Sequence, residues 1–446
     1  MLSPEDNEIL TRVGPGTLMG DLLRRYWIPA CLSSEIDEPD GPPARVRLLG
    51  EDLVAFRDTR GDIGLIEEQC PHRGASLFYG RNEDCGLRCT YHGWKFDVHG
   101  QCVDQRSELR PFAHRIKITS YPVHESGGIV WAYLGPDDAM TPFRDFGTED
   151  LPAEHVAAAK EIIYCNWVQS MDGDVDTADV SNLHQFDAID DVPDDGTDKP
   201  GYPSGYMSMK FWRHDPRALI EVQDTWHGFR YAGIRRTPNG HRHARITAYI
   251  FPASNIIAQI PVATRQIFVV PSDDYTTYRY NFTTQPPANP RGLGGPPFFS
   301  YEKYPFEMMP RHGIVARTYT RDNDYLIDRV AQKGTSYSGI RDFRSQDAMA
   351  TETAGPIYDR TREHLGSTDV AVIRMHRQLL RAAKGLAEGR PPPALGGTGD
   401  FRSIRGAEKV LADGEDWRVL GTDDDPIVTE AMLAPMDSEP EGDGVH

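Results

Sequence analysis

Two short stretches of the chain each carry one cysteine and one histidine at a spacing suited to metal binding. Cys70 and His72 stand two positions apart, Cys89 and His92 stand three apart, and sixteen residues separate the pairs. Two loops of this kind supply two thiolates and two imidazoles. Such donors can hold two bridged irons, the sulfurs on one and the nitrogens on the other, and the neutral imidazoles raise the reduction potential. The pattern predicts an electron-carrying [2Fe-2S] centre.

The alternative for these donors is a structural zinc site of two cysteines and two histidines. Such sites usually combine Cys-x(2–4)-Cys with His-x(3–5)-His, a combination that this sequence lacks. We interpret the remaining cysteines, at positions 31, 85, 102 and 165, as ordinary thiols. A disulfide framework is not expected from cysteines scattered through a long chain without an export signal.

A second group of possible metal ligands follows later in the chain. Asp176, Asp179 and His184 lie in a stretch predicted as helical, 166–186, and Asp347 lies in another, 345–387. In a regular helix Asp179 and His184 would point about 140° apart, so a shared metal requires a widened turn of π type. One imidazole with two carboxylates makes a harder site than two imidazoles with one carboxylate.

The elements that must position these residues can be read from hydrophobic periodicity. Residues 16–29 show helical spacing up to Pro29, and residues 44–135 show short strands divided by turns. Long alternating runs over 217–284 predict one large antiparallel sheet. The Pro, Gly and Asp-rich segment 187–205 predicts a surface loop or lid, and the region from 390 predicts an irregular tail.

Composition places the chain among globular proteins. It has 446 residues, 39% hydrophobic and 10% aromatic, with a formal charge of −19. That charge argues against nucleic acid as a partner and suits a basic protein or a small molecule. No signal peptide and no apolar run long enough to span a membrane are present, so we expect a cytoplasmic protein.

The residues around these ligands resemble those of a known enzyme family. The flanks 73–77 and 93–97 of the cysteine and histidine pairs closely resemble the Rieske domains of ring-hydroxylating oxygenases. Residues 164–184 are similar to the family segment Asp-x-x-His-x(4)-His, and 359–369 resembles a later motif. Together these match the phthalate dioxygenase branch, which includes phthalate 4,5-dioxygenase, phenoxybenzoate dioxygenase and dehydrodivanillate O-demethylase.

The resemblance implies a role for each candidate residue. Cys70, His72, Cys89 and His92 would hold a Rieske [2Fe-2S] cluster. His184 and Asp347 would be ligands of a mononuclear iron(II), and Asp176 would carry electrons between subunits. Asp179 stands where the family has its first histidine ligand. It would ligate the metal as a carboxylate, stand aside from a poorly occupied site, or disable turnover.

The resemblance also implies an α+β fold of two main domains. An all-β Rieske domain would span 41–152, and a helix-grip, START-like catalytic domain with a curved antiparallel sheet would span 153–389. A helical segment over 1–40 would pack on the catalytic domain, and 390–446 would form a C-terminal extension.

The implied reaction uses O2 and electrons from a separate NADH-dependent reductase with flavin and ferredoxin domains. The chain would be the terminal oxygenase, a homotrimer or stacked hexamer that dihydroxylates or O-demethylates a carboxylated or phenolic aromatic compound. A carboxylate requires a cation in the pocket. The arginine candidates are Arg213, Arg230, Arg235, Arg236, Arg242, Arg245 and Arg265.

Two other functions stay open because of Asp179. One is a non-catalytic or metal-altered paralogue that keeps its cluster and has lost its iron. The other is a helix-grip protein that only binds an aromatic ligand. A third iron, beyond the two of the cluster, distinguishes the oxygenase from both.

Overall fold

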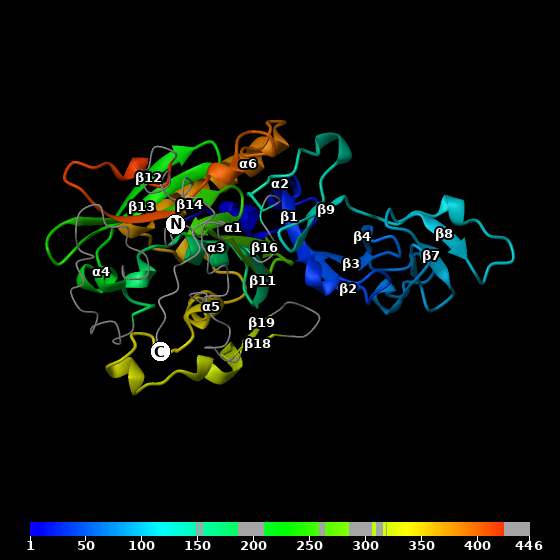
Figure 1. Ribbon diagram of the computed structural model, residues 1–446, viewed down its shortest axis with the longest axis horizontal. Coiled ribbons are helices and arrows are strands. Elements are labelled where there is room, and N and C mark those ends of the chain that lie inside the picture. The colour runs from blue at the N-terminus through cyan, green and yellow to red at the C-terminus, as the bar shows by residue number, and fades with distance from the viewer. Residues whose placement is uncertain are drawn as a thin grey trace, which may run out of the picture.

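Two small antiparallel sheets carry the cysteine and histidine loops, at the right of Figure 1. Both sheets confirm the short strands predicted over 44–135. The strands are β2 (Ala44–Leu48), β3 (Glu51–Arg57) and β4 (Ile63–Glu67), then β5 (Arg81–Asn82), β6 (Leu87–Arg88), β7 (Trp94–Phe96) and β8 (Cys102–Gln105). Both sheets contribute to a small core, which includes Phe56, Leu87, Trp94 and Phe96 as well as Cys70 and Cys89. Other side chains of the first sheet, such as Val46, Leu53 and Leu65, pack into the main core of the molecule.

The computed structural model describes residues 1–148, 151, 155–185, 209–257, 264–284, 306–308, 315–317 and 319–422. The loop or lid predicted at 187–205 lies outside these residues. So does the chain from 423 onward.

The helix predicted over 16–29 is wrong in its second half. Helix α2 (Leu18–Leu23) is short, and Trp27 begins strand β1 (Trp27–Leu32), which pairs with β10 (Ile129–Tyr133). Pro29 is tolerated because β1 is an edge strand and its register shifts between Pro29 and Cys31. Strand β9 (Val123–Ser126) completes this sheet.

A large antiparallel sheet forms the second part of the molecule and confirms the strands predicted between 217 and 284. Its order is β11-β17-β16-β15-β14-β13-β12. The bounds are β11 (Val156–Ile163), β12 (Leu219–Thr225), β13 (Gly228–Arg236), β14 (Arg242–Ile250), β15 (Ser254–Ile257), β16 (Thr264–Pro271) and β17 (Thr277–Thr284). A short separate hairpin joins β18 (Phe306–Met308) to β19 (Val315–Arg317).

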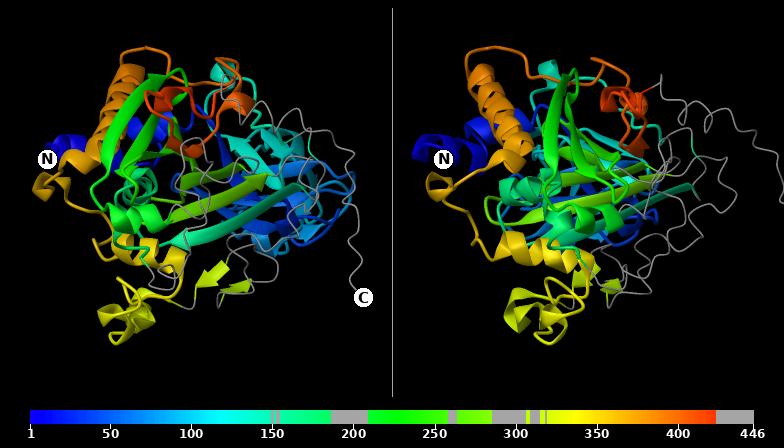
Figure 2. Two further views of the ribbon diagram at one scale, coloured as in Figure 1. Left: turned by 60° about the vertical axis from the view of Figure 1, so that its left-hand side comes forward. Right: turned by 90° about the vertical axis from the view of Figure 1, so that its left-hand side faces the viewer.

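The helices pack around this sheet. The long helix α6 (Val370–Ala387) contacts β12, α2 and α1 (Pro4–Thr11), and Figure 2 shows it in orange beside the green strands. Helix α3 (Trp167–Val175) contacts β16, α5 (Phe343–Glu352) and α6. Helix α4 (Met209–His214) contacts β13. The α+β class is confirmed, with a long helix held against a curved antiparallel sheet.

The region beyond residue 390 contributes to the sheet, which the sequence did not predict. Strand β20 (Ala407–Leu411) pairs with β14, and Trp417 and Leu420 are buried beside it. No helix among the described residues is long and apolar enough to cross a membrane. The domain boundaries at 40, 152 and 389 stay predictions.

Candidate iron-sulfur and mononuclear metal sites

The two cluster loops share one backbone framework. In each loop the cysteine N–H donates to the carbonyl five residues later, at 2.9 Å for Cys70 and 2.8 Å for Cys89. The N–H of Gly74 or Gly93 donates back to that cysteine's carbonyl, at 2.8 and 2.9 Å. Both glycines have φ near +75°, a left-handed conformation that only glycine adopts readily. The repeated turn brings the paired donors to the same end of the sheets.

The two histidines lie close together, and so do the two cysteines. The imidazole centroids of His72 and His92 lie 4.4 Å apart, and the His72 ring stacks on the indole of Trp94 at 4.6 Å. Burial raises the pKa of the Cys70 thiol to about 12, and the backbone N–H of His72 opposes that rise. The charge of Cys89 and a side-chain hydrogen bond with it raise the pKa of Cys70 further, so the two sulfurs lie together.

This arrangement fits a Rieske [2Fe-2S] cluster. Cys70 and Cys89 are 2% and 3% exposed, whereas both histidines are half-exposed. The Nδ1 atom of His72 is buried and has no hydrogen-bond partner among the described residues. Burying a nitrogen without a hydrogen-bond partner costs free energy. Coordination of iron by this nitrogen would remove that cost. The sulfurs thus face the interior and the imidazoles face the surface, where electrons enter or leave.

The second site is formed where helix α3 ends. Asn166 caps the start of α3, and Asp176 caps its end, because the helix stops at Val175. The carboxylate of Asp176 accepts the N–H of Ala178 at 2.6 Å. The chain then makes a 3-10 turn from Asp179 to Ser181. The expected turn of π type is therefore wrong: the α-helix ends early, and a tighter turn follows.

Asp179, His184 and Asp347 come together at this point. One potential ligand atom from each lies within 4.8 Å of the others, and this is the one such group found among the described residues. The Nε2 atom of His184 lies 3.0 Å from Asp347 Oδ1 and 3.6 Å from Asp179 Oδ2. Asp347 enters from α5, so the site joins two helical segments that are distant in the sequence. Asp176 is not part of this group.

The orientation of His184 is fixed by its neighbours. The amide nitrogen of Gln346 donates to the Ile340 carbonyl at 2.6 Å, so its oxygen faces His184 Nδ1, also at 2.6 Å. Nδ1 must then carry the proton, which leaves the Nε2 lone pair facing two carboxylates. The ring also stacks on Phe343 at 3.6 Å. A proton or a cation is required between Nε2 and these oxygens, so the set fits a divalent metal.

The charges at this site are strongly coupled. Burial would lower the pKa of His184, but the charge of Asp347 and hydrogen bonds to both aspartates outweigh it and raise that pKa to about 10. Burial and the charge of Asp179 raise the pKa of Asp176 to about 7. The two neighbouring carboxylates therefore repel each other. Asp179 Oδ1 is buried without a hydrogen-bond partner among the described residues, as a metal ligand would be.

Most of the candidate arginines form hydrogen bonds within the protein. Arg235 donates to the Thr177 carbonyl at 2.6 Å, and Arg245 donates to the Thr177 hydroxyl at 3.0 Å. Arg230 donates to the carbonyls of Arg418 and Leu420. Arg242 donates to the Glu415 carbonyl at 3.0 Å, Arg265 donates to Asn281 at 3.3 Å, and the backbone N–H of Arg236 donates to Asp215 at 2.9 Å.

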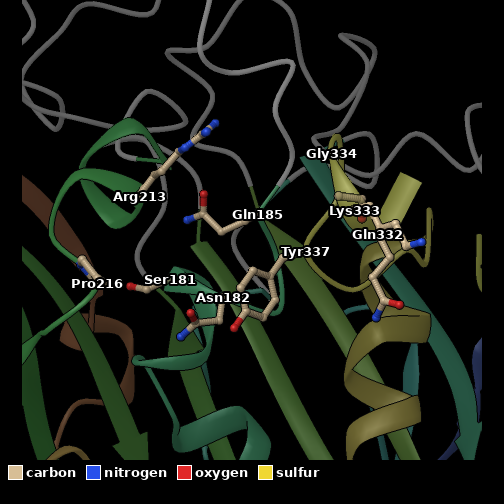
Figure 3. Close-up of a pocket in the computed structure, with 10 residues that line it drawn as sticks. Ser181, Asn182, Gln185, Arg213, Pro216, Gln332, Lys333, Gly334 and Tyr337 are labelled. Carbon is tan, nitrogen blue, oxygen red and sulfur yellow. The ribbon is translucent and has the colours of Figure 1, made fainter. Parts of the chain in front are cut away.

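Arg213 lines a pocket together with Asn182 and Gln185, which flank His184 in the sequence. The pocket has a volume of about 340 Å³, and Figure 3 shows Arg213 and Lys333 on opposite sides of it, with Asn182, Gln185 and Tyr337 between them. Its lining also includes Ser181, Pro216, Gln332, Gly334 and Ser336. Two cations and no acid among the described lining residues make this pocket suitable for an anion.

Two buried residues near the donors were missed by sequence reasoning. Gln346 orients His184, and Arg279 lies behind Asp347. Gln346 adjoins Asp347 in the sequence, which was the one available signal. The sequence of the strand around Arg279 contains no pattern that indicates a position near the metal donors.

Comparison with known proteins identifies the family. Residues 26–122 match the family described as Rieske [2Fe-2S] domain, and residues 132–439 match the family described as LigXa C-terminal domain like. The chain is 37% identical to the phthalate 4,5-dioxygenase oxygenase subunit of Pseudomonas putida, over 96% of this chain and 98% of that one. It is 32% identical to the 5,5'-dehydrodivanillate O-demethylase oxygenase subunit of Sphingobium sp. strain NBRC 103272 / SYK-6, over 89% and 84% of the two chains.

A solved structure supports the fold. The reduced complex between oxygenase and ferredoxin in carbazole 1,9a-dioxygenase aligns with a TM-score of 0.54 at 18% identity, covering 87% of this chain and 98% of that chain. The cofactors of this chain are the Rieske cluster and a mononuclear iron. The chain belongs to the Rieske non-haem iron ring-hydroxylating oxygenases and is the oxygenase subunit of a multicomponent oxidoreductase that incorporates oxygen from O2.

Proposed function

We propose that Asp179, His184 and Asp347 hold the mononuclear iron, and that Cys70, His72, Cys89 and His92 hold the cluster. The convergence of three ligand atoms within 4.8 Å supports the first set most directly. When bound, the iron supplies a centre for activating O2 beside the substrate. The protein contributes the fixed tautomer of His184 and the two carboxylates that face its Nε2 atom.

Asp176 carries electrons into this site from the cluster of a neighbouring subunit. Its carboxylate is half-buried and adjoins the N–H of Asp179, which connects it to the proposed ligand set. Figure 1 places the cluster sheets at one end of the molecule and α5 in the other part. In a homotrimer or hexamer, the cluster of a second copy would lie closer to the proposed iron site than the cluster of the same chain. Electrons reach the cluster from an NADH-dependent reductase with flavin and ferredoxin domains, in the cytoplasm.

The substrate is an aromatic carboxylate or a related phenol. Arg213 and Lys333 offer the cations that a carboxylate needs, and Asn182 and Gln185 connect their pocket to the chain segment of His184. The names of the two relatives indicate dioxygenation of phthalate and O-demethylation of dehydrodivanillate. The reaction on this pocket's ligand is one of these two types.

Metal analysis and oxygen uptake test this proposal. Purified protein should contain a third iron beyond the two of the cluster, and should consume O2 with a reductase and one member of a panel of aromatic acids. Arg213→Gln should raise KM about tenfold for a carboxylated substrate, because one charged hydrogen-bond partner is lost, and should leave KM for a neutral analogue unchanged. Equal effects on both substrates would contradict the assignment of Arg213.

The Asp179 substitution favours one second candidate, an oxygenase paralogue that has lost or exchanged its iron. That protein would hold only the two irons of the cluster, or a harder metal such as manganese in the second site. It would show no substrate-dependent O2 uptake with any acid of the panel.

A further inference from the structure

A buried arginine stands behind the proposed iron ligands. Arg279 of β17 is 4% exposed and faces three carboxylates that come from different elements. Its guanidinium pairs with Asp174 of α3, and its Nη1 atom lies 3.3 Å from Glu161 Oε1 of β11. The same Nη1 lies 3.9 Å from Asp347 Oδ2. The large sheet thereby contacts α5, which supplies Asp347, and α3, which ends just before the turn that supplies Asp179.

Asp347 divides its two oxygens between this arginine and the metal site. Oδ1 lies 3.0 Å from His184 Nε2, and Oδ2 lies on the side of Arg279. A carboxylate ligand needs a partner for its outer oxygen, because free rotation would turn the inner oxygen away from the metal. The planar guanidinium is itself held by Asp174 and Glu161, so it offers a fixed partner.

The charge of Arg279 suits a site with two carboxylates. Asp179 adds a second negative charge beside Asp347 at His184, and buried anions that lie close together repel one another. A permanent cation against Asp347 offsets part of this repulsion, and it cannot be lost by deprotonation.

We propose that Arg279 is a positioning residue for the mononuclear iron: it orients Asp347 and offsets the negative charge that Asp179 adds. The inference rests on the proposed ligand set of Asp179, His184 and Asp347. Loss of an outer partner of this kind typically lowers metal affinity about 10–100-fold. Arg279→Gln should show a loss in that range, and Arg279→Lys, which keeps the charge without the planar fork, should show a smaller one.

A matched control separates positioning from general stability. Arg360 is also fully buried and pairs with an aspartate of α3, Asp172, at 2.6 Å. It therefore resembles Arg279 in its burial and in the helix it pairs with, but its partner is not a proposed ligand. Arg360→Gln should lower the thermal unfolding temperature and leave the iron affinity within about twofold of wild type.

The experiment measures iron(II) binding to the holoprotein after selective removal of its mononuclear metal, by anaerobic equilibrium dialysis. The visible spectrum of the cluster reports the folded fraction of each variant. Weaker iron binding in Arg279→Gln than in Arg360→Gln, at equal cluster content, supports the inference. Equal affinities for Arg279→Gln and wild type overturn it, as does an equal loss in Arg360→Gln.

Wild type and His184→Ala distinguish this failure from failure of the ligand set. If wild type binds a third iron and His184→Ala does not, the ligand set stands, and the Arg279 result decides the inference by itself. If wild type and His184→Ala bind iron equally weakly, the ligand set is wrong, and the inference falls with it.

Discussion

The two metal sites of this oxygenase differ in how far apart their donors stand in the sequence. The cluster donors lie within residues 70–92, on two loops with the same hydrogen-bonding pattern. The second site joins the end of α3 to α5, and its histidine is oriented by a residue 162 positions away. The first site depends mainly on local turns, and the second depends on the packing of α3, α5 and the large sheet.

The sites also differ in chemistry. The proposed cluster donors are two thiolates and two imidazoles. The second site combines two carboxylates with one imidazole, whose Nδ1 atom faces Gln346, and a buried arginine lies beside Asp347. A site encoded by local turns keeps its donors if its loops are intact, whereas a site assembled over distance depends on partners that no motif describes.

The largest effect should come from His184→Ala. It removes the only nitrogen donor of the described ligand group, so iron affinity should fall by more than the roughly 100-fold expected for an outer partner. Oxygen uptake should fall to background, while the cluster spectrum stays unchanged. His376→Ala, another buried histidine of the catalytic part, is the control. A parallel loss of the cluster in His184→Ala would contradict the independence of the two sites.

Gln346→Leu should have the next largest effect. Without the Gln346 oxygen, Nδ1 of His184 loses its partner and the tautomer is no longer fixed. Iron affinity should fall about 10–100-fold, measured by equilibrium dialysis. Gln378→Leu, a half-buried glutamine on α6, should bind iron like wild type. Unchanged iron binding in Gln346→Leu would show that stacking on Phe343 alone orients the ring.

Asp179→His should have a smaller effect in the opposite direction. A second imidazole softens the site, so the ratio of iron(II) to manganese(II) affinity should rise several-fold to about tenfold. Competition dialysis measures this ratio, and oxygen uptake with reductase measures turnover. If Asp179→His neither prefers iron(II) over manganese(II) more strongly than wild type nor consumes oxygen faster, Asp179 is a fully competent ligand.

The smallest effect at either metal site should come from Asp172→Asn. Asp172 of α3 forms ion pairs with Arg360 and His376. Burial opposes its charge, but Arg360 and His376 lower the pKa of Asp172 to about 2, from 3.8. Because the folded pKa is depressed, this contribution is fully present above pH 4 to 5 and is lost as pH falls towards 2. The shift corresponds to roughly 2 kcal/mol of unfolding free energy.

Thermal unfolding between pH 6 and pH 3 measures this contribution. The stability difference between wild type and Asp172→Asn should be constant down to about pH 5 and then shrink. A difference that grows as the pH falls would contradict the depressed pKa.

Much of the fold could be predicted because its strands alternate clearly. The alternating runs predicted over 217–284 include the strands β12, β14, β16 and β17. The prediction for 16–29 failed because helical spacing continues to Tyr26, whereas the backbone of Trp27 and Ile28 pairs with β10, which is distant in the sequence. Strand β20 was missed because a short edge strand in a Pro and Gly-rich tail has little periodicity of its own.

The sequence alone predicted the cluster site, because each of two short turns with glycine at a left-handed position carries one cysteine and one histidine. It also located Asp176, Asp179, His184 and Asp347. Tertiary structure decided which of these meet, since α3 ends before Asp176 and α5 brings Asp347 beside His184. It also supplied Gln346 and Arg279, because partners from distant elements are defined by packing, which leaves no pattern along the chain.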